Sequence, residues 1–566
     1  MSVKFVMIFF FLFVAAFTNF TKDNSLNKNA EAITCSPNTV DDAVLSESGK
    51  YIDILPGWGN YSYTISTAND SAQLYFNQGL TLYYSYHAKE ATASFKEAAR
   101  FDNGCAMAYW GQALAMGPTY NGAHLYKTST SIKEIIAKMN VAASNAPAKE
   151  QELITIMNSR YNINDPSGDR TLLNQSWSDG LKDLSIKYPG DIDIKALYVD
   201  AVMLQHPWDF WQTDGKAKPW APGLINFTEE ILYKYPRHPA ALHYYIHLTE
   251  ASKNPETAFN AADKLKTLFP GVAHMVHMSS HLYERNGMYE NGVAVNEKAD
   301  ASLQLYDSLA PQLSLAKHSS HYFAVSSYCA LSGAMYKAAL PLYYKCRKSL
   351  SPSAENTYHQ YLYMLPQMAM VRMGKWDDIL RDTTNPDAAW PYAIILNEFA
   401  KGMAYTSKGN LQMANDCLAH IRQKKNDSSL AVYNIPFNKP LSGAIIAEHI
   451  LQSSIFFTSG KQNDAIAAIK KAIAAEDSLI YSEPRDWMLP ARQYLGYYLL
   501  KMNKPAAAGE VYRKDLIENP GNGWSALGLY QSLQQQKKKK GSVSYKAIYL
   551  QSFSAADVVP PYSVYQ

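Results

Sequence analysis

The chain has 566 residues, with 53 lysines and arginines against 50 aspartates and glutamates, which gives a net charge of +3. This length exceeds the size at which one hydrophobic core stops growing, so we expect several domains or an array of repeats. The small net charge argues against a dedicated nucleic-acid binder, and the five scattered cysteines predict neither a disulfide framework nor a CxxC metal site.

The first 20 residues have the pattern of an export signal. Lys4 precedes the apolar run FVMIFFFLFVAAF, and a polar segment rich in Asn and Lys begins at Thr21. Because the run is short for a membrane span, we interpret residues 1–20 as a cleaved signal peptide rather than an anchor. We therefore predict a secreted or periplasmic protein without a stable membrane span, in which residues 21–70 form a partly irregular N-terminal extension.

From residue 71 onward, apolar residues recur at helical spacing, and the helices come in pairs divided by Gly, Asn or Pro. In the most regular pair, AQLYFNQGLTLYYSYHAKEATASFKEAARFDNG, Gly79 lets two helices approach closely, Phe95 fills the gap and Asn103 breaks the chain. A second such pair surrounds Gly496 and Tyr512. This arrangement resembles the tetratricopeptide repeat (TPR), whose period is about 34 residues.

The resemblance implies an all-α fold, a TPR-like α-solenoid in which helical hairpins stack into a right-handed superhelix over residues 71–535. The first helix of each pair lines the concave surface of such proteins. Four lysines, Lys537 to Lys540, follow this region. We interpret residues 536–566 as a Lys-rich linker and tail rather than as a phosphate-binding patch.

Seven histidines at helical spacing lie between residues 239 and 322, on successive first helices of the predicted pairs. They are His243 and His247, then His274, His277 and His281, then His318 and His321. At 100° per residue, the first pair and Glu250 share one arc of their helix, and the next three histidines share one arc of theirs. We therefore predict that these residues meet in the concave groove.

A bound metal ion is one chemical interpretation of this cluster. The outer members of a trio on one helix are about 10 Å apart, so one ion cannot bind all three. We predict a site with two ligands from one helix and one or two from the next, such as His243 and His247 with His277 or His281. Neutral imidazole favours Zn or Cu in an exported protein. The site requires three imidazole nitrogens within about 4 Å of a common point.

If such a metal were catalytic, Glu250, Tyr244 or Tyr283 would transfer protons beside an open coordination position. The common enzyme motifs GxSxG and HExxH are absent from the sequence. The segment HYYIHLTE shares the HxxxH spacing of zincin helices but lacks the Glu after the first His, which argues against a metalloprotease.

Two interpretations without a metal stay open. In one, the histidines hydrogen-bond a peptide, glycan or small molecule in the groove, with Trp208, Trp211 and Tyr245 as its aromatic wall. In the other, the histidines only pack against tyrosines and bond to the backbone. We predict an exported helical-repeat protein whose groove binds a ligand or partner and a transition metal, and the alternative is a metal-dependent enzyme. We expect no nucleic-acid partner.

The segments RHPAALHYYIHLTE and HMVHMSSHLYERNGMYE resemble a family of uncharacterised secreted or bacterial TPR proteins with the motif HYYIH…HMxHMxxH. The resemblance extends over residues 71 to about 535. Relatives often read HMPSHIY where this chain has HMSSHLY, a change that leaves the histidines in place. The resemblance implies the helical-repeat fold and little about activity, because repeat scaffolds host many functions.

Overall fold

The computed structural model describes residues 44–162, 169–316, 318–432 and 438–566. Within these ranges the chain forms 26 α-helices and four 3-10 helices, without a strand, and its one isolated β-bridge joins Trp211 and Ala217. The prediction of an all-α fold is confirmed. The predicted signal peptide, residues 1–20, lies outside these ranges and stays a prediction. Among the described helices, none is long and apolar enough to cross a membrane.

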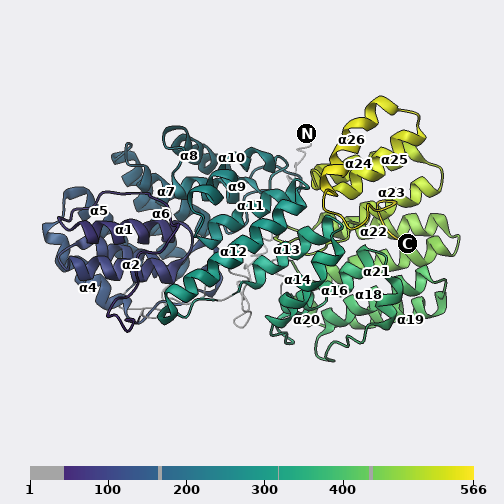
Figure 1. The fold of residues 1–566 in the computed structure, drawn as a ribbon, viewed down its shortest axis with the longest axis horizontal. Coiled ribbons are helices and arrows are strands. Elements are labelled where there is room, and N and C mark those ends of the chain that lie inside the picture. Colours follow the sequence, from purple (N-terminus) through teal and green to yellow (C-terminus); the bar gives the residue numbers. More distant parts are fainter. Residues whose placement is uncertain (1–43, 163–168, 317, 433–437) are drawn as a thin grey trace, which may run out of the picture.

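The helices follow the chain along the long axis of the molecule, from α1 at one end through α9 to α13 in the middle (Figure 1). The first half contains α1 (Asp70–Tyr84), α2 (Ala88–Phe101), α3 (Ala106–Ala115), α4 (Ile132–Ala142), α5 (Ala148–Ser159), α6 (Arg170–Lys187), α7 (Ile192–Gln205), α8 (Ala221–Lys234), α9 (Pro239–Thr249), α10 (Phe259–Leu268), α11 (Ala273–Arg285), α12 (Tyr289–Leu309) and α13 (Ser320–Ser332). Its 3-10 helices are η1 (Tyr120–Leu125), η2 (Ala143–Asn145), η3 (Pro255–Ala258) and η4 (Pro311–Leu313).

The second half occupies the other end of the molecule. It contains α14 (Tyr336–Lys348), α15 (Thr357–Tyr363), α16 (Leu365–Arg372), α17 (Trp376–Arg381), α18 (Pro391–Ser407), α19 (Leu411–Lys424), α20 (Ser429–Val432), α21 (Pro440–Thr458), α22 (Gln462–Asp477), α23 (Ala491–Lys501), α24 (Pro505–Glu518), α25 (Gly523–Gln535) and α26 (Lys539–Ser552).

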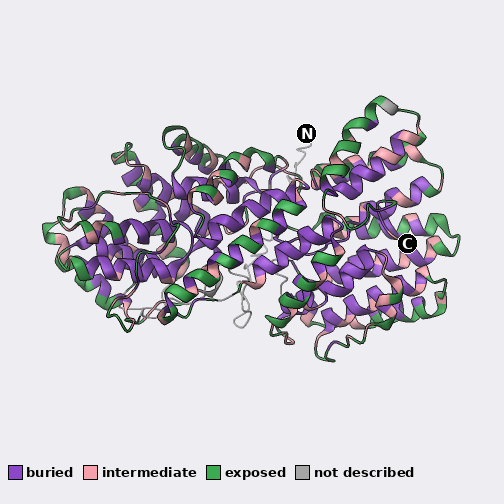
Figure 2. Ribbon diagram, viewed as in Figure 1, coloured by how far each residue is buried: buried purple, intermediate pink, exposed green. Residues whose placement is uncertain are grey.

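Consecutive helices pack as hairpins, most extensively α1 with α2, α11 with α12 and α21 with α22. The first helix of one hairpin also packs on the first helix of the next, as α9 does on α11 and α11 on α13. Buried residues concentrate on the faces between helices, and exposed residues on the outer faces and loops (Figure 2). Each hairpin therefore buries its apolar faces against its neighbours, which is the packing of an α-solenoid.

An aromatic side chain between two glycines sets the spacing of the hairpins at both ends. A Cβ built on Gly79 of α1 or on Gly111 of α3 would lie 2.8 Å or 2.3 Å from the Phe95 ring of α2. At the C-terminal end, Cβ atoms on Gly496 and Gly528 would lie 2.3 Å and 2.2 Å from the Tyr512 ring. Real Cβ atoms cannot come this close, so the two small residues admit the ring.

Gly496→Leu is therefore expected to destabilise the protein by about 1–3 kcal/mol, because the added side chain overpacks the contact with α24. Gly541→Leu is the matched control, because a Cβ at that helical position meets no atom within 4 Å. Thermal unfolding of both variants tests the expectation. Equal melting temperatures would show that the close approach contributes nothing.

The segment before α1 belongs to the folded body. Ile52, Leu55, Trp58 and Ile65 are at most 7% exposed and join the same core as the first helices. The array also curves back on itself, because α1 packs against α9, although about 160 residues of chain separate them. This contact places the turn between α1 and α2 beside the histidine-bearing helices.

The C-terminal boundary differs from the expectation. Residues 536–566 were expected to be a linker and tail, but α26 packs on α25 as a further hairpin. The chain after α26 returns to the core, where Ser563 and Val564 are buried and the Tyr512 hydroxyl lies 2.7 Å from Ser563 Oγ. The lysine run covers only the turn before α26 and the first turn of that helix. The rest of α26 presents an apolar face to α25, so the lysines do not prevent the helix from joining the fold.

Candidate metal centre

Six histidines on three adjacent first helices form one buried cluster. They are His243 and His247 on α9, His274, His277 and His281 on α11, and His321 on α13, each at most 5% exposed. Spacings of three and four residues put the members of each helix on one face, and the packing of α11 between α9 and α13 brings the three faces together.

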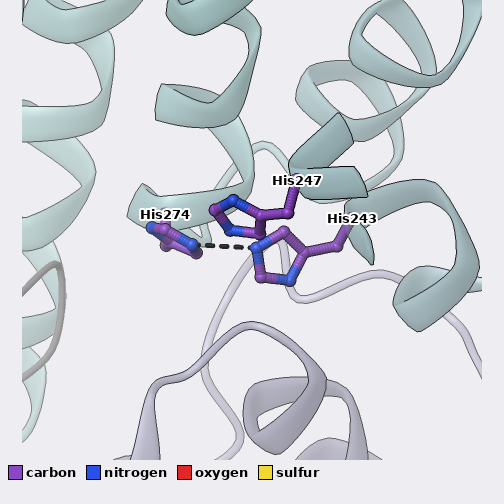
Figure 3. A group of neighbouring side chains, drawn as sticks. All are labelled: His243, His247 and His274. Carbon is purple, nitrogen blue, oxygen red and sulfur yellow. Dashed lines mark hydrogen bonds between the residues drawn. The ribbon is translucent and has the colours of Figure 1, made fainter. Parts of the chain in front are cut away.

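The first trio consists of His243, His247 and His274 (Figure 3). One nitrogen from each ring lies within 4.8 Å of the other two. The Nε2 atoms of His243 and His274 are 2.9 Å apart. The Nδ1 atom of His243 is 2.7 Å from the backbone oxygen of Tyr84, to which it donates. This bond leaves a lone pair on His243 Nε2, aimed at the centre of the trio.

The second trio consists of His277, His281 and His321, with the same limit of 4.8 Å between ligand atoms. The Nε2 atoms of His277 and His281 are 3.0 Å apart. Three atoms that lie within this distance of one another have a common point at most about 2.8 Å from each of them. Zn–N bonds are about 2.0–2.1 Å long, so a small inward movement of the rings would bring the nitrogens to bonding distance. Both trios therefore meet the geometric condition stated above for three imidazole nitrogens.

The outward Nδ1 atoms of His277 and His281 both lie beside oxygen atoms. His277 Nδ1 lies 2.6 Å from Asn296 Oδ1, and the amide of Asn296 is oriented because its Nδ2 donates to the Gly292 carbonyl. His281 Nδ1 lies 2.7 Å from a carboxylate oxygen of Glu483. Oxygen atoms on this side favour the tautomers with the proton on Nδ1, which direct the Nε2 lone pairs toward one another. The two Nε2 atoms are joined either by a proton on one of them or by a metal ion bound by both.

A pair of carboxyl groups lies between the two trios. Glu250 Oε1 is 2.8 Å from His247 Nδ1 of the first trio, and Glu250, His281 and Glu483 themselves form a third group with ligand atoms within 4.8 Å. Burial, followed by the charge of Glu483, raises the pKa of Glu250 well above its ordinary value. Burial also acts to raise the pKa of Glu483, but the neighbouring His281 outweighs it and the pKa is lowered.

Burial favours the neutral form of five of the imidazoles. It lowers the pKa of His243 to about 3, against the opposing effect of the bond to the Tyr84 carbonyl. It also lowers the pKa of His321 to about 3, and the pKa values of His247, His274 and His277 fall well below their ordinary value for the same reason. Neutral imidazole is the form that binds transition metals.

Several buried polar atoms of the cluster have no hydrogen-bond partner within the described residues. They are His247 Nε2, His274 Nδ1, His281 Nδ1, His321 Nδ1, Glu250 Oε2 and one oxygen of Glu483. Buried polar atoms are nearly always paired, and an ion is one of the groups that satisfies them. The donor set of imidazole nitrogens and carboxylate oxygens fits Zn, Cu, Fe or Ni.

The ligand pattern differs in one respect from the prediction. Two ligands do come from one helix and one from the next, but His274 completes the site of His243 and His247, in place of His277 or His281. The reason is that α9 and α11 run in the same direction, so that His243 meets His274 in the first turn of α11, and Glu250 at the end of α9 meets His281 farther along. His277 and His281 instead face His321 on α13.

His318 does not join the cluster. Its side chain is 50% exposed and its Nδ1 lies 3.1 Å from both carboxylate oxygens of Asp300. The residue precedes α13, which begins at Ser320, so it is not held on the face that carries His321. His318 therefore lies apart from the two trios, because the helical spacing on which its prediction as a metal ligand rests begins only at Ser320.

The three tyrosines singled out in the sequence point elsewhere. The Tyr244 ring packs between Tyr84 and Tyr86 in the core, and the Tyr245 hydroxyl donates to Glu229. The Tyr283 hydroxyl bonds with Lys266 and Asp263 on α10. Within the described residues, Tyr283 has no ring contact or hydrogen bond with the trios, and Tyr244 meets them only through its ring, whose centroid lies 5.5 Å from that of His243. Tyr245 lies outside any shared aromatic wall, because neighbouring positions on a helix face different directions.

The histidines were expected to line an open groove, whereas the structure buries them. The turn after α1 covers the first trio, where the Tyr86 and His243 ring centroids are 4.7 Å apart. The segment that carries Glu483, between α22 and α23, covers the second. Trp208 and Trp211 do line a cavity, on the outer side of this cover.

Asn296 and Glu483 are the functional residues that sequence reasoning missed. Asn296 lies on α12, the second helix of its hairpin, and Glu483 follows His281 by about 200 residues. Neither has a local pattern that distinguishes it from other polar residues. The one available signal was that metal-bound histidines require acceptors for their second nitrogen.

Comparisons with known proteins give no family assignment. No family model matches the chain, and no curated protein matches it. Among solved structures, the chain is similar to a human IFIT1 dimer with PPP-AAAA (12% identity, 78% of this chain and 90% of that chain, TM-score 0.34). It is also similar to the P58(IPK) TPR domain (12%, 60% and 93%, TM-score 0.18) and to yeast Tom70 (10%, 87% and 91%, TM-score 0.28). Similarities this low carry no argument about function, and the helical-repeat fold rests on the packing described above.

Proposed function

We propose that this protein is a helical-repeat protein that binds divalent transition metal ions, one in each histidine trio. The observation that carries the proposal is the pair of facing Nε2 atoms of His277 and His281, 3.0 Å apart. Their Nδ1 atoms lie beside oxygen atoms, of the Asn296 amide for His277 and of the Glu483 carboxylate for His281. Two ligands of one tetrahedral zinc ion lie about 3.3 Å apart, so this spacing is close to that of a metal site.

The surroundings supply what a buried ion requires. Glu483, whose pKa is lowered, provides negative charge beside the second trio, and Glu250 supplies a second carboxylate between the trios when a bound cation displaces its proton. This charge offsets the cost of removing the ions from water. Asn296, Glu483 and the Tyr84 carbonyl orient three of the imidazoles, as outer-shell partners do in metal proteins.

The burial of the site favours metal binding over catalysis by the metal. A catalytic ion needs an open coordination position that the substrate reaches, and here the six imidazoles are at most 5% exposed. The ions would instead join α9, α11 and α13 to the segment between α22 and α23, and so tie distant parts of the solenoid together.

The test is elemental analysis of protein that carries no His tag, after loading with Zn, Cu, Fe or Ni and gel filtration. We expect one ion per trio, and we expect the loaded protein to unfold at a higher temperature than chelator-treated protein. A free ion concentration 100 times the dissociation constant stabilises a folded protein by about 2.7 kcal/mol per site. Protein that retains none of these metals and gains no thermal stability from them would contradict the proposal.

A further inference from the structure

A cavity of about 510 Å³ lies beside the metal centre. Its wall includes Ala251 and Ser482, the chain neighbours of Glu250 and Glu483, but its lining residues include none of the six histidines. The cavity is therefore a second site next to the first. Its volume lies in the range of sites that hold small molecules.

Four basic side chains line this cavity, and two of them are neutralised by the protein. Lys253 forms an ion pair with Glu518. Arg492 binds both carboxylate oxygens of Asp477, at 2.6 Å and 2.7 Å. A bidentate pair of this kind leaves little of the guanidinium charge for a ligand.

The other two, Arg285 and Arg485, donate to the same acceptor. Their guanidinium nitrogens lie 3.1 Å and 2.7 Å from the backbone oxygen of Glu518. The second bond of Arg285 goes to the Ser252 carbonyl, and its buried Nε has no hydrogen-bond partner within the described residues. No ion pair joins either arginine to a carboxylate in the described part of the chain. Two like charges are thus held together with only neutral oxygens as acceptors.

The described acidic groups around the cavity do not form ion pairs with these two arginines. Four of its lining carboxylates are each paired with another cation: Asp209 with Lys218, Asp214 with Lys216, Asp477 with Arg492, and Glu518 with Lys253. Burial raises the pKa of Glu284 to about 8, although Arg485 and Arg285 act in the opposite direction. Burial also raises the pKa values of Glu476 and Asp486, which line the cavity, to about 8. At neutral pH these carboxyl groups are mostly protonated.

Aromatic rings form much of the remaining wall. Trp208 and Trp211 lie on one side, and Tyr481 and Trp487 come from the segment that also carries Glu483. The Arg285 guanidinium lies 5.3 Å from the centre of the Tyr481 ring. A ligand at this place would meet paired guanidinium groups at one end and flat apolar surfaces around the rest of its body.

We propose that this cavity binds a small organic anion, whose carboxylate or phosphate group lies between Arg285 and Arg485 and whose apolar body packs against the tryptophans. Guanidinium groups recognise both oxyanions through paired hydrogen bonds. The proposal goes beyond metal binding and does not depend on it, because none of the histidines of the two trios lines the cavity.

Isothermal titration calorimetry on chelator-treated protein tests the proposal with three probes of similar shape: phenylacetate, phenyl phosphate and the neutral phenylacetamide. We expect one equivalent of an anionic probe to bind. The affinity for phenylacetamide should be lower by at least about tenfold, because the neutral amide loses a hydrogen bond between charged groups. The tighter of the two anions identifies the preferred oxyanion. If neither anion binds, or if the amide binds equally well, the proposal is wrong.

Variants locate the site. Arg285→Gln and Arg485→Gln are each expected to lower the affinity for the preferred anion by about tenfold or more. Arg492→Gln is the matched control, because Arg492 lines the same cavity but is already paired with Asp477, and it should change the affinity by less than about threefold. An equal loss of affinity in all three variants would show that the anion does not bind between Arg285 and Arg485. Arg485→Gln carries the test if Arg285→Gln does not fold. Failure of metal binding would leave these results unchanged.

Discussion

Replacing one histidine in each trio is expected to remove all stoichiometric metal from the protein. His243→Ala takes one of three imidazoles from the first trio, and His277→Ala takes one member of the facing pair from the second. Two remaining nitrogens do not complete a site that normally takes three or four protein ligands. We therefore expect each single variant to lose the ion of its own trio and the double variant to lose both. Elemental analysis after gel filtration measures the number of metal ions bound per protein chain.

The double variant has to remain folded for this result to count. Because the stability of a repeat array is spread over many neighbouring contacts, we expect unchanged helical content by circular dichroism. His449→Ala is the control for the loss of a histidine as such. His449 lies on α21, bonded to Gln452, and has no contact with either trio. A folded double variant with full metal content, or an equal loss in His449→Ala, would count against the two sites.

Asn296→Ala is expected to weaken metal binding in the second trio by about 10–100-fold without removing any ligand. Asn296 holds the proton of His277 on Nδ1, through a contact of 2.6 Å, and so keeps Nε2 available for the ion. Without this acceptor, the ring can carry its proton on Nε2 and turn away from the site. Competition with a chromophoric chelator measures the affinity.

Two further variants separate this effect from a general loss of packing. Asn296→Asp keeps an acceptor oxygen in place and should restore most of the affinity. Asn286→Ala removes a similar side chain at the end of α11, where Asn286 Nδ2 donates to the Leu282 carbonyl, and should leave binding unchanged. If the aspartate variant binds as weakly as the alanine variant, the role of Asn296 is only structural.

The helical repeats were predictable because their signals are local. Gly79 and Phe95 lie 16 residues apart, and the apolar positions around them recur at the period of a helix, so one hairpin defines its own packing. The same holds for Gly496 and Tyr512. The prediction of a linker at residues 536–566 differs from the structure, which has α26 there. The lysine run at the start of this segment has no apolar residue, and the apolar positions of α26 lie farther along the chain.

Part of the candidate metal centre was predictable for the same reason. Spacings of three or four residues place histidines on one face of a helix whatever surrounds it, so His243 with His247, and His277 with His281, were expected to act together. His318 shows the limit of this reasoning. It continues the pattern in the sequence, but it precedes the first turn of α13 and points to Asp300.

The amino-acid sequence alone determined the all-helical class, the hairpin repeat and the faces that carry the histidines, because these depend on contacts within about 40 residues of chain. Only the tertiary structure decided which histidines share a trio, that they are buried, and that Glu483 lies against His281. Those features depend on how far the solenoid curves. Small rotations at each hairpin interface add up along the chain, and no local pattern records their sum.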